Sequence, residues 1–362
     1  MKIVQFEKQK GWSGQAQQSF LAAKGLHLRG HKVLMVCQSN SIIGKEAENS
    51  GIAVIYLPMV GLRLFLSAIR LGLYLRKNKY DILHSHGARD HLLSIISCQI
   101  SGNGKVLRSK HNMKKVRRGW LQYNYFTNSL SAVSRPAYCT LEEIGIPQSK
   151  IRLIYSSFDL SRFSPHDPSP EFLGKLNISR SNFVIGTMGR LTNTSKGTEI
   201  LLRAAPIILE EFPDARFLLV GHPGKKLPRL ADRLNISDRV IFPGFTEDVS
   251  GALCCMDLYV QPSITEALSS SIIQAMAMQK PVVASDTGGI PEVVDSGKTA
   301  LLCTPGDPEA LAQTILGLIK DKNKLLEMGS LGRKRALEKF SLDRMIDDIE
   351  AWYRQVLQKP ES

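Results

Sequence analysis

Short apolar runs alternate along the chain with longer segments in which apolar residues recur every three or four positions. In the first half the short runs are predicted strands, at 3–6, 32–37, 53–56, 82–84, 106–108 and 131–133. Helical patterns lie between them, for example at 14–28 and 91–100. Short apolar strands separated by helices are typical of a parallel sheet that helices cover on both faces.

The same alternation starts again in the second half of the chain. The predicted strands there are 183–188, 217–220, 240–242, 258–260, 281–284 and 301–302, followed by helical segments at 308–335 and 341–357. A Ser- and Pro-rich stretch at 156–170, SSFDLSRFSPHDPSP, is typical of a linker. The pattern predicts an α/β chain of two doubly wound, Rossmann-like domains, residues 1–155 and 171–340. A ligand cleft is expected where the carboxyl ends of their strands face each other.

The turn after the first predicted strand is where a dinucleotide-binding motif, common in such folds, would lie. A dinucleotide-dependent dehydrogenase needs a Gly-x-Gly-x-x-Gly turn at this place. Residues 7–14, EKQKGWSG, do not form that motif, and the chain contains no P-loop. The pattern therefore favours another nucleotide ligand over a dinucleotide cofactor.

A loop with two cations follows the strand predicted at 183–188. The sequence IGTMGRLTNTSKG places Arg190 and Lys196 beyond the strand end, with Gly189 at the turn. Arginine offers a planar fork to two phosphate oxygens, and lysine offers a mobile point charge. Both residue types suit a diphosphate leaving group, whose negative charge they would stabilise.

A second candidate element is the stretch QPSITEALSSSIIQAMAMQKPVVASDTGGIPE, at 261–292. Its three serines, 269–271, could supply an N-cap to a helix at 272–278. The free N–H groups and the positive end of such a helix attract phosphate. Glu266 precedes the helix and Gln274 lies more than a turn inside it, so the two could contact different parts of one ligand. A capped helix in an unrelated α/β protein is the alternative for this segment taken alone.

These two elements together resemble the signature of family four of the retaining glycosyltransferases, enzymes of the GT-B fold. The resemblance implies that Arg190 and Lys196 bind the donor diphosphate. It also implies that Glu266 holds the hydroxyls of the donor sugar and that residue 274 holds the ribose. The family has glutamate at that second position, whereas Gln274 offers a carbonyl without charge. Further donor-binding residues implied at these elements are Gly189, Leu268, Ser269 and Ser270.

Softer matches extend the resemblance to other parts of the chain. Gly14 lies where the family has a glycine-rich turn at the donor phosphate, and His111 lies where a family histidine contacts the transferred sugar. Phe245 falls in the loop that the family places against the nucleobase, although a core-facing or loop-packing ring fits the sequence as well. His84 and His86 are interpreted as structural or acceptor-side residues. The family resemblance also implies that the last helix, within 341–362, crosses back to the first domain.

The absence of one sequence motif limits the catalytic mechanisms that we expect. There is no Asp-x-Asp pair, the metal–diphosphate motif of the other main glycosyltransferase fold. We therefore expect Arg190, Lys196 and the helix N-terminus to stabilise the leaving group without an obligatory metal ion or a cofactor. No second carboxylate suits a double displacement. The retention implied by the resemblance is therefore interpreted as same-face attack, in which the departing phosphate oxygen helps to deprotonate the acceptor.

The net charge of +14 is concentrated in the first half of the chain. Between residues 49 and 141 there are fourteen Lys and Arg but only two acids, and 105–118 alone holds seven basic residues. Just upstream, 62–79 combines apolar residues with further arginine and lysine. This combination favours an anionic membrane surface as a partner. An ordinary core helix beside a solvated basic loop is the alternative. Nucleic acid is not expected as a partner, because no recognisable module or interleaved aromatic pattern is present.

The cysteine spacing and the first ten residues indicate where in the cell we expect the protein. The six cysteines, at 37, 98, 139, 254, 255 and 303, show no Cys-x-x-Cys spacing and are expected to be reduced thiols of a cytoplasmic protein. The first ten residues lack the apolar region of a signal peptide, and no apolar run is long enough to span a bilayer. We expect a peripheral protein on the cytoplasmic face of the inner membrane.

The leading hypothesis is a retaining glycosyltransferase that moves a sugar from a nucleotide-sugar donor to a membrane-linked acceptor such as lipopolysaccharide core. The alternative is a non-catalytic GT-B protein that binds a nucleotide or a partner. Gln274 and the pair Ser156–Ser157, where family members often carry Asn-Gly, support that alternative. A nucleotide-sugar epimerase shares the fold and is a third hypothesis.

Overall fold

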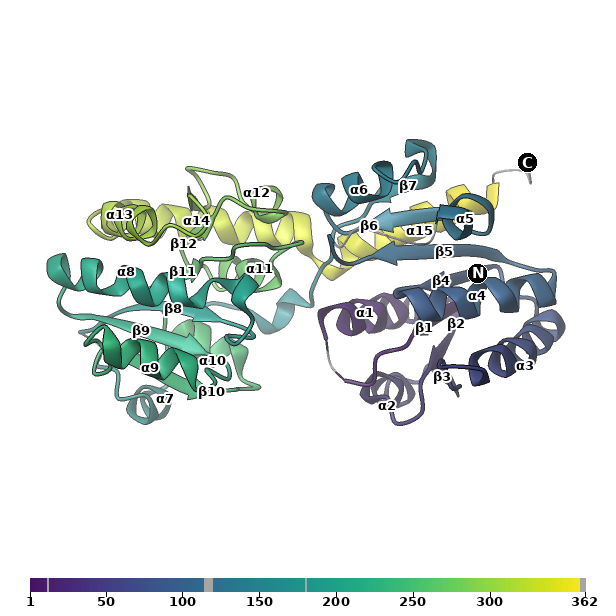
Figure 1. The fold of residues 1–362 in the computed structure, drawn as a ribbon, viewed down its shortest axis with the longest axis horizontal. Coiled ribbons are helices and arrows are strands. Elements are labelled where there is room, and N and C mark those ends of the chain that lie inside the picture. Colours follow the sequence, from purple (N-terminus) through teal and green to yellow (C-terminus); the bar gives the residue numbers. More distant parts are fainter. Residues whose placement is uncertain (12, 114–119, 180, 359–362) are drawn as a thin grey trace. The chain divides into compact units, whose positions relative to one another are not determined.

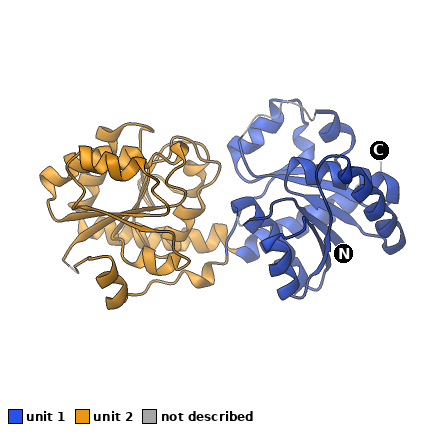
Figure 2. Cartoon of the chain, turned by 60° about the horizontal axis from the view of Figure 1, so that its bottom comes forward, with its two compact units in different colours: residues 1–158, 342–362 blue, residues 159–341 orange. Residues whose placement is uncertain are grey.

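The computed structural model of the chain describes residues 1–11, 13–113, 120–179 and 181–358. The chain divides into two compact units, Met1–Phe158 with Leu342–Ser362 and Asp159–Ser341 (Figure 2). The last helix, α15 (Leu342–Gln358), therefore belongs to the unit that contains the N-terminus.

The first unit is built on a parallel sheet. Within the described residues, its seven strands lie in the order β3-β2-β1-β4-β5-β6-β7 (Figure 1). The strands are β1 (Lys2–Glu7), β2 (Lys32–Cys37), β3 (Ala53–Tyr56), β4 (Ile82–Ser85), β5 (Lys105–Lys110), β6 (Ser129–Ala132) and β7 (Ile151–Leu153). Strand order reverses between β1 and β4, and ligands of such sheets bind beyond the carboxyl ends of the strands at that point.

Helices cover both faces of this sheet. They are α1 (Gly14–Leu28), α2 (Ile42–Asn49), α3 (Arg63–Asn78), α4 (Ala88–Ser101), α5 (Trp120–Tyr125), α6 (Arg135–Glu142), the 3₁₀ turn η1 (Gln148–Lys150) and α15. Ile3 of β1 belongs to an apolar cluster with α1 and α15, whereas its neighbour Val4 belongs to a cluster with α3 and α4. Successive strand residues point to opposite faces, so the two clusters lie on opposite sides of the sheet.

The final helix packs on the first unit because one stripe of it is apolar. Its buried residues are Met345, Ile346, Ile349, Glu350, Trp352, Tyr353 and Val356, a helical spacing. Against α1 the approach is close: a Cβ on Gly25 would lie 2.6 Å from the Ile346 side chain. Only glycine permits that distance without a shift of α15 or of the Ile346 rotamer.

The second unit repeats the architecture. In the part of it that the structure describes, six parallel strands lie in the order β10-β9-β8-β11-β12-β13 (Figure 1). They are β8 (Phe183–Met188), β9 (Ala215–Val220), β10 (Val240–Gly244), β11 (Leu258–Gln261), β12 (Val282–Ser285) and β13 (Leu301–Cys303). The order reverses between β8 and β11, so the loops after these two strands lie at the binding edge.

The helices of the second unit complete the α/β layers. They are α7 (Pro170–Lys175), α8 (Thr198–Glu211), α9 (Lys226–Arg233), α10 (Val249–Cys254), α11 (Ser270–Ala277), α12 (Ile290–Val293), α13 (Pro308–Ile319) and α14 (Lys322–Phe340), with 3₁₀ turns η2 (Leu160–Arg162) and η3 (Thr194–Lys196). The predicted α/β class and the two Rossmann-like sheets are thus confirmed, and each predicted strand is present within one or two residues.

One predicted helix is divided in the structure. The segment expected to be helical over 308–335 breaks after α13, because Asp321 leaves the helical conformation and caps a new helix, α14. Its side chain accepts a hydrogen bond of 3.0 Å from the Lys324 backbone N–H. An aspartate within an amphipathic pattern can therefore be a helix start, and the prediction of one helix was wrong.

Candidate functional site

The loop after β8 is shaped by two glycines. Gly189 and Gly221 both have φ of +137°, and a Cβ on Gly221 would lie 2.1 Å from the Gly189 carbonyl oxygen. The Gly189 N–H donates to the Val220 carbonyl at 3.0 Å, so the loops after β8 and β9 lie against each other. This arrangement leaves Arg190 exposed to solvent at the binding edge of the sheet.

The two motifs found separately in the sequence meet in the structure. Lys196 Nζ lies 2.5 Å from Glu266 Oε2, although the residues are 70 positions apart. Their loops are also joined through the backbone, since Ile264 N–H donates to the Ser195 carbonyl at 2.8 Å. At Gly197, φ is +62° and a Cβ would lie 1.8 Å from the Pro262 carbonyl oxygen, so this approach requires glycine.

A buried polar network supports Glu266. Gln261, at the end of β11, accepts hydrogen bonds of 2.8 Å from Tyr259 and from Ser271. It donates to Ser263 Oγ at 2.8 Å, and Ser263 Oγ lies 3.5 Å from Glu266 Oε2. Neither Gln261 nor Ser263 was predicted from the sequence. A glutamine directly after the strand predicted at 258–260 is the signal that could have identified them, because an amide that a buried strand carries inward needs partners.

The start of α11 differs from the expected serine cap. Ser269 is at the N-cap position, but its side chain makes no capping hydrogen bond. Its hydroxyl lies 3.1 Å from Ser271 Oγ, which is itself committed to Gln261. Ser269 is thus the N-cap residue, as expected, but the capping hydrogen bond is absent because the hydroxyls of Ser269 and Ser271 belong to the buried network. The first-turn N–H groups of α11 are consequently left without a side-chain partner among the described residues, which suits an anionic ligand.

The remaining donor-site candidates of the second unit lie in different environments. Gln274 is half-buried in the second turn of α11, and Ser270 is exposed at its start. Leu268 is only 7% exposed, so a ligand would meet its backbone more readily than its side chain. Phe245 follows β10 and is 80% exposed, so the alternative of a core-facing ring is wrong.

The first unit places Gly14 at the start of α1. It is exposed and follows Ser13, whose hydroxyl accepts a hydrogen bond of 3.2 Å from Ala16 N–H and so caps the helix. The loop before the helix is held by Glu7 at the end of β1, which accepts from Gln9 N–H at 2.9 Å and from the Gln15 amide at 3.2 Å. Burial and the neighbouring Asp90 raise the pKa of Glu7 to about 7.

His111 belongs to a chain of buried polar side chains at the β1–β4 switch point. Its Nε2 lies 2.9 Å from His86 Nδ1, and His86 Nε2 lies 2.9 Å from Gln5 Oε1. Gln5 also donates to the Tyr353 hydroxyl at 2.9 Å. That hydroxyl is 2.6 Å from His84 Nδ1, so a side chain of the C-terminal helix links Gln5 to His84. His84 then reaches Ser109 at 2.8 Å.

These histidines are neutral at physiological pH. Burial lowers the pKa of His84 and of His111 to about 3, and it lowers the pKa of His86 well below its usual value. Nearby positive charge, from Arg108 in the case of His111, acts in the same direction. Each ring therefore has one donor and one acceptor nitrogen.

Gln5 decides which nitrogen of His111 carries the proton. Its Nε2 donates to Tyr353, so its Oε1 faces His86, which must donate from Nε2. A neutral His86 then accepts at Nδ1, and His111 donates from Nε2. The other nitrogen of His111, Nδ1, is left as a hydrogen-bond acceptor. His111 was predicted from the sequence as a candidate, whereas Gln5 and Tyr353 were not, because nothing local relates β1 to a helix more than 300 residues away.

Comparison with known proteins identifies the family. Residues 182–321 match the model described as "Glycosyl transferases group 1", and residues 12–162 match "Glycosyltransferase Family 4". The two matched regions together span most of the chain, and the chain is a glycosyltransferase. The resemblance inferred from the sequence is thereby confirmed, and glycosyl transfer from a nucleotide-sugar donor is the reaction that these matches support.

Relatives of this glycosyltransferase are distant but extend over most of their lengths. It is 26% identical to "N-acetyl-alpha-D-glucosaminyl L-malate synthase" of Bacillus anthracis, over 78% of this chain and 76% of the relative. It is 24% identical to "UDP-Gal:alpha-D-GlcNAc-diphosphoundecaprenol alpha-1,3-galactosyltransferase" of Escherichia coli, over 79% and 78%. The solved structure of Anabaena Alr3699/HepE in complex with UDP matches its fold with a TM-score of 0.85 and 24% identity, over 98% of this chain and 100% of that one.

Two further observations concern metals and membranes. Among the described residues, no three His, Cys, Asp or Glu side chains gather as a metal site would require. Within the same ranges, every helix is too short or too polar to cross a bilayer.

Proposed function

We propose that this glycosyltransferase transfers a sugar from a nucleotide-sugar donor, with retention of configuration and without an obligatory metal ion, to a membrane-linked glycan or lipid. The observation that carries the proposal is the contact of Lys196 with Glu266 beside the uncapped start of α11. It brings a cation for the diphosphate and a carboxylate for sugar hydroxyls to one binding edge.

The donor would lie along the loops after β8 and β11. Arg190, Lys196 and the first-turn N–H groups of α11 bind the diphosphate, while Glu266 accepts from sugar hydroxyls. Gln274 reaches the ribose with its amide. The other contacts proposed for the donor are Gly14, Gly189, Phe245, Leu268, Ser269 and Ser270. HepE, which shares the fold, was solved with UDP, and this supports a nucleoside diphosphate as the leaving group.

The reaction we propose breaks the bond between the anomeric carbon and the diphosphate oxygen. The bonding electrons pass to the diphosphate, whose growing charge Arg190 and Lys196 stabilise. The acceptor hydroxyl attacks the same face of the sugar and transfers its proton to the departing phosphate oxygen. His111 offers its Nδ1 lone pair to a hydroxyl of the transferred sugar, and the chain through His86 and Gln5 holds it in that tautomer.

The acceptor would be presented at a membrane, at the cytoplasmic face of the inner membrane. Along α3 the side chains Phe65, Leu66, Ile69 and Leu73 are between 47% and 61% exposed, and Leu62 just before it is 80% exposed. Arg70, Arg76 and Lys77 accompany them on the same helix. An exposed apolar stripe with cations is what an anionic bilayer surface binds. The Escherichia coli relative, named for a diphosphoundecaprenol substrate, supports a lipid-linked acceptor.

The membrane proposal has a direct test. Four cations of the basic stretch, Lys114, Lys115, Arg117 and Arg118, lie outside the described residues and are replaced together by glutamine. Sedimentation with phosphatidylglycerol vesicles should weaken, with no change in nucleotide affinity. Four exposed lysines of the second unit, Lys322, Lys324, Lys334 and Lys339, provide a control with the same change in charge. Equal losses in both variants would mean that only net charge matters.

A non-catalytic nucleotide-binding protein is the alternative function. It is favoured by Gln274, because an amide binds a ribose hydroxyl less strongly than a carboxylate does. The two functions differ in turnover and agree in nucleotide binding. Release of a nucleoside diphosphate from a nucleotide sugar in the presence of acceptor therefore distinguishes them.

The donor site is tested by thermal unfolding with UDP, GDP, ADP and CMP. A nucleotide at 100 times its dissociation constant stabilises the native state by about 2.7 kcal/mol, or roughly a few degrees in Tm. The double variant Arg190→Ala, Lys196→Ala should lose this response. If no nucleotide raises the Tm of the wild type, the proposed donor site is wrong.

A further inference from the structure

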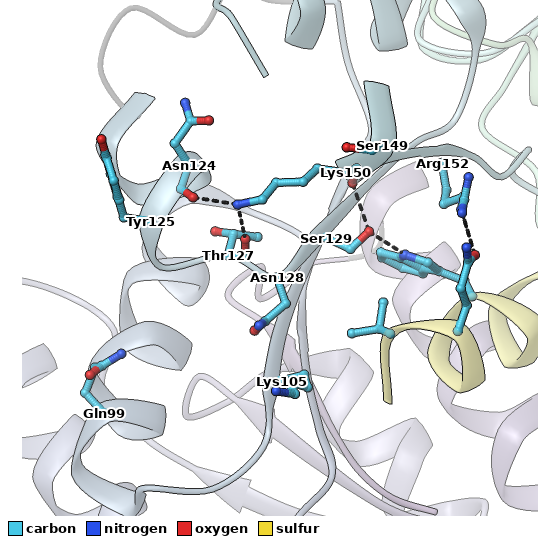
Figure 3. Close-up of a pocket in the computed structure, with 13 residues that line it drawn as sticks. Gln99, Lys105, Asn124, Tyr125, Thr127, Asn128, Ser129, Ser149, Lys150 and Arg152 are labelled. Carbon is cyan, nitrogen blue, oxygen red and sulfur yellow. Dashed lines mark hydrogen bonds between the residues drawn. The ribbon is translucent and has the colours of Figure 1, made fainter. Parts of the chain in front are cut away.

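A cavity of about 780 Å³ lies in the first unit at the amino ends of β5, β6 and β7 (Figure 3). Its walls come from the starts of these strands and from residues of α4, α5 and α15. Lys105, in its wall, begins β5, and His111 follows the end of the same strand. The two residues are therefore roughly 20 Å apart along the sheet. The cavity therefore lies at the opposite end of the strands from the hydrogen-bonded side chains of Gln5, His86 and His111, which we call the relay.

The lining carries positive charge without an acid. The described residues that line the cavity include Lys105, Lys150 and Arg152, and they include no Asp or Glu. Lys150 Nζ donates to the backbone carbonyls of Asn124, at 2.5 Å, and Thr127, at 3.3 Å. Arg152 donates from Nε and Nη2 to the Gln355 amide oxygen (Figure 3). Neutral oxygens orient these two cations, and no ion pair within the described residues compensates their charges.

Donors remain available after these bonds are made. Lysine has three N–H donors and arginine five. In the part of the chain that the structure describes, Lys150 has one N–H left over and Arg152 has its Nη1 group. Burial also lowers the pKa of Lys150, so its positive charge is costly at this position. An anion at this place would reduce that cost.

The shape and the other lining groups suit a ligand larger than a simple ion. A volume of about 780 Å³ lies within the range of small-molecule sites. Hydroxyl and amide side chains, including Ser149 and Asn128, line the wall, and the exposed ring of Tyr125 lies at its edge (Figure 3). Polar groups that hydrogen-bond hydroxyls, together with an aromatic face, are suited to a sugar or a polyol.

We infer that this cavity is a second binding site, for a phosphate monoester or diester of a sugar or polyol, held through Lys150 and Arg152. It goes beyond the proposed transfer reaction and does not depend on it, because none of the residues proposed for the donor lines this cavity. Two sources share this chemistry, a soluble sugar phosphate and the headgroup of an anionic lipid.

The test uses the full chain with Arg190→Ala and Lys196→Ala, so that the proposed donor site cannot contribute. Glucose 1-phosphate is titrated by calorimetry, with methyl glucoside as the neutral comparison, and phosphatidylglycerol vesicles are tested by sedimentation. Lys150→Met with Arg152→Gln should weaken binding about a hundredfold, since two charge-assisted contacts are lost. Arg152→Gln alone should weaken it about tenfold and leaves the Lys150 bonds to the backbone in place.

The matched control replaces two exposed lysines of the same unit, Lys24 and Lys45, by methionine. It should bind like the parent. Glucose 1-phosphate binding that requires Lys150 and Arg152 identifies a soluble ligand, and vesicle binding with the same requirement identifies a lipid headgroup. The inference is overturned if neither probe binds, or if both pocket variants bind as tightly as the control.

Discussion

Removal of the Glu266 carboxylate should move substrate turnover and nucleotide affinity in opposite directions. In the proposed complex Glu266 holds sugar hydroxyls, so Glu266→Ala loses a charge-assisted hydrogen bond at the reacting sugar. Such a bond contributes about 1.5–3 kcal/mol, and its loss lowers kcat/KM by about 10- to 150-fold. The nucleoside diphosphate lacks the transferred sugar, so it does not lose this contact.

The geometry of the Lys196–Glu266 ion pair determines the expected change in nucleotide affinity. Lys196 Nζ is 2.5 Å from Glu266, and the two side chains are 26% and 15% exposed. A partly exposed pair is worth about 1 kcal/mol. In Glu266→Ala this attraction no longer competes with the diphosphate for Lys196. The nucleoside diphosphate should therefore bind up to about fivefold more tightly, while turnover falls.

The assay measures both quantities on the same preparations. Calorimetry with the nucleotide that gives the thermal response reports affinity, and release of that nucleotide reports turnover. Glu199→Ala is a matched control, because Glu199 pairs with Lys226 at 2.7 Å in the same unit. It should change neither quantity by more than about twofold. A parallel fall of affinity and turnover in Glu266→Ala would refute the assignment of Glu266 to the sugar.

Three further predictions concern the relay, the β1–α1 loop and the ribose contact. Tyr353→Phe removes the hydroxyl that Gln5 and His84 share, so the free energy of unfolding in urea should fall by about 2–4 kcal/mol. An unchanged urea midpoint would contradict this hydrogen-bonded relay. Glu7 has a pKa of about 7 in the fold against its ordinary 4.5, so the folded state holds an extra proton between these values. Stability should fall as pH rises from about 4.5 to 7, and Glu7→Gln should flatten that slope in thermal scans. Gln274→Glu should tighten binding of the nucleotide severalfold if residue 274 meets the ribose, and calorimetry showing weaker binding would argue against that contact.

Much of the fold followed from local pattern. Apolar runs such as 183–188 and 258–260 are buried on both faces, so their composition alone indicated parallel strands. The candidate donor residues were found because they are strand-end features: Gly189 and Arg190 follow β8, and Glu266 follows β11. In a doubly wound sheet the position after a strand specifies the binding edge, which makes such residues readable from sequence.

Side-chain partnerships were not readable in the same way. The serines at the start of α11 match an N-cap pattern, yet the Ser271 hydroxyl donates to Gln261 and the Ser269 hydroxyl lies against that of Ser271, because a buried strand amide must be satisfied first. Asp321 lies in an apparently continuous helical pattern and ends it, since an aspartate suits both an exposed helix position and a cap. In both cases the choice depends on neighbours that are remote in the sequence.

The sequence by itself determined the α/β class, the two sheets and the strand-end motifs, because each depends on periodicity or spacing within a few residues. Only the tertiary structure decided which side chains meet. It joined Lys196 to Glu266 across 70 positions and placed Tyr353 of α15 between Gln5 and His84. It also gathered Lys150 and Arg152 under the same helix at the far edge of the sheet. These contacts depend on how α15 packs against the first unit and on how strands order in a sheet, and neither is encoded in local pattern.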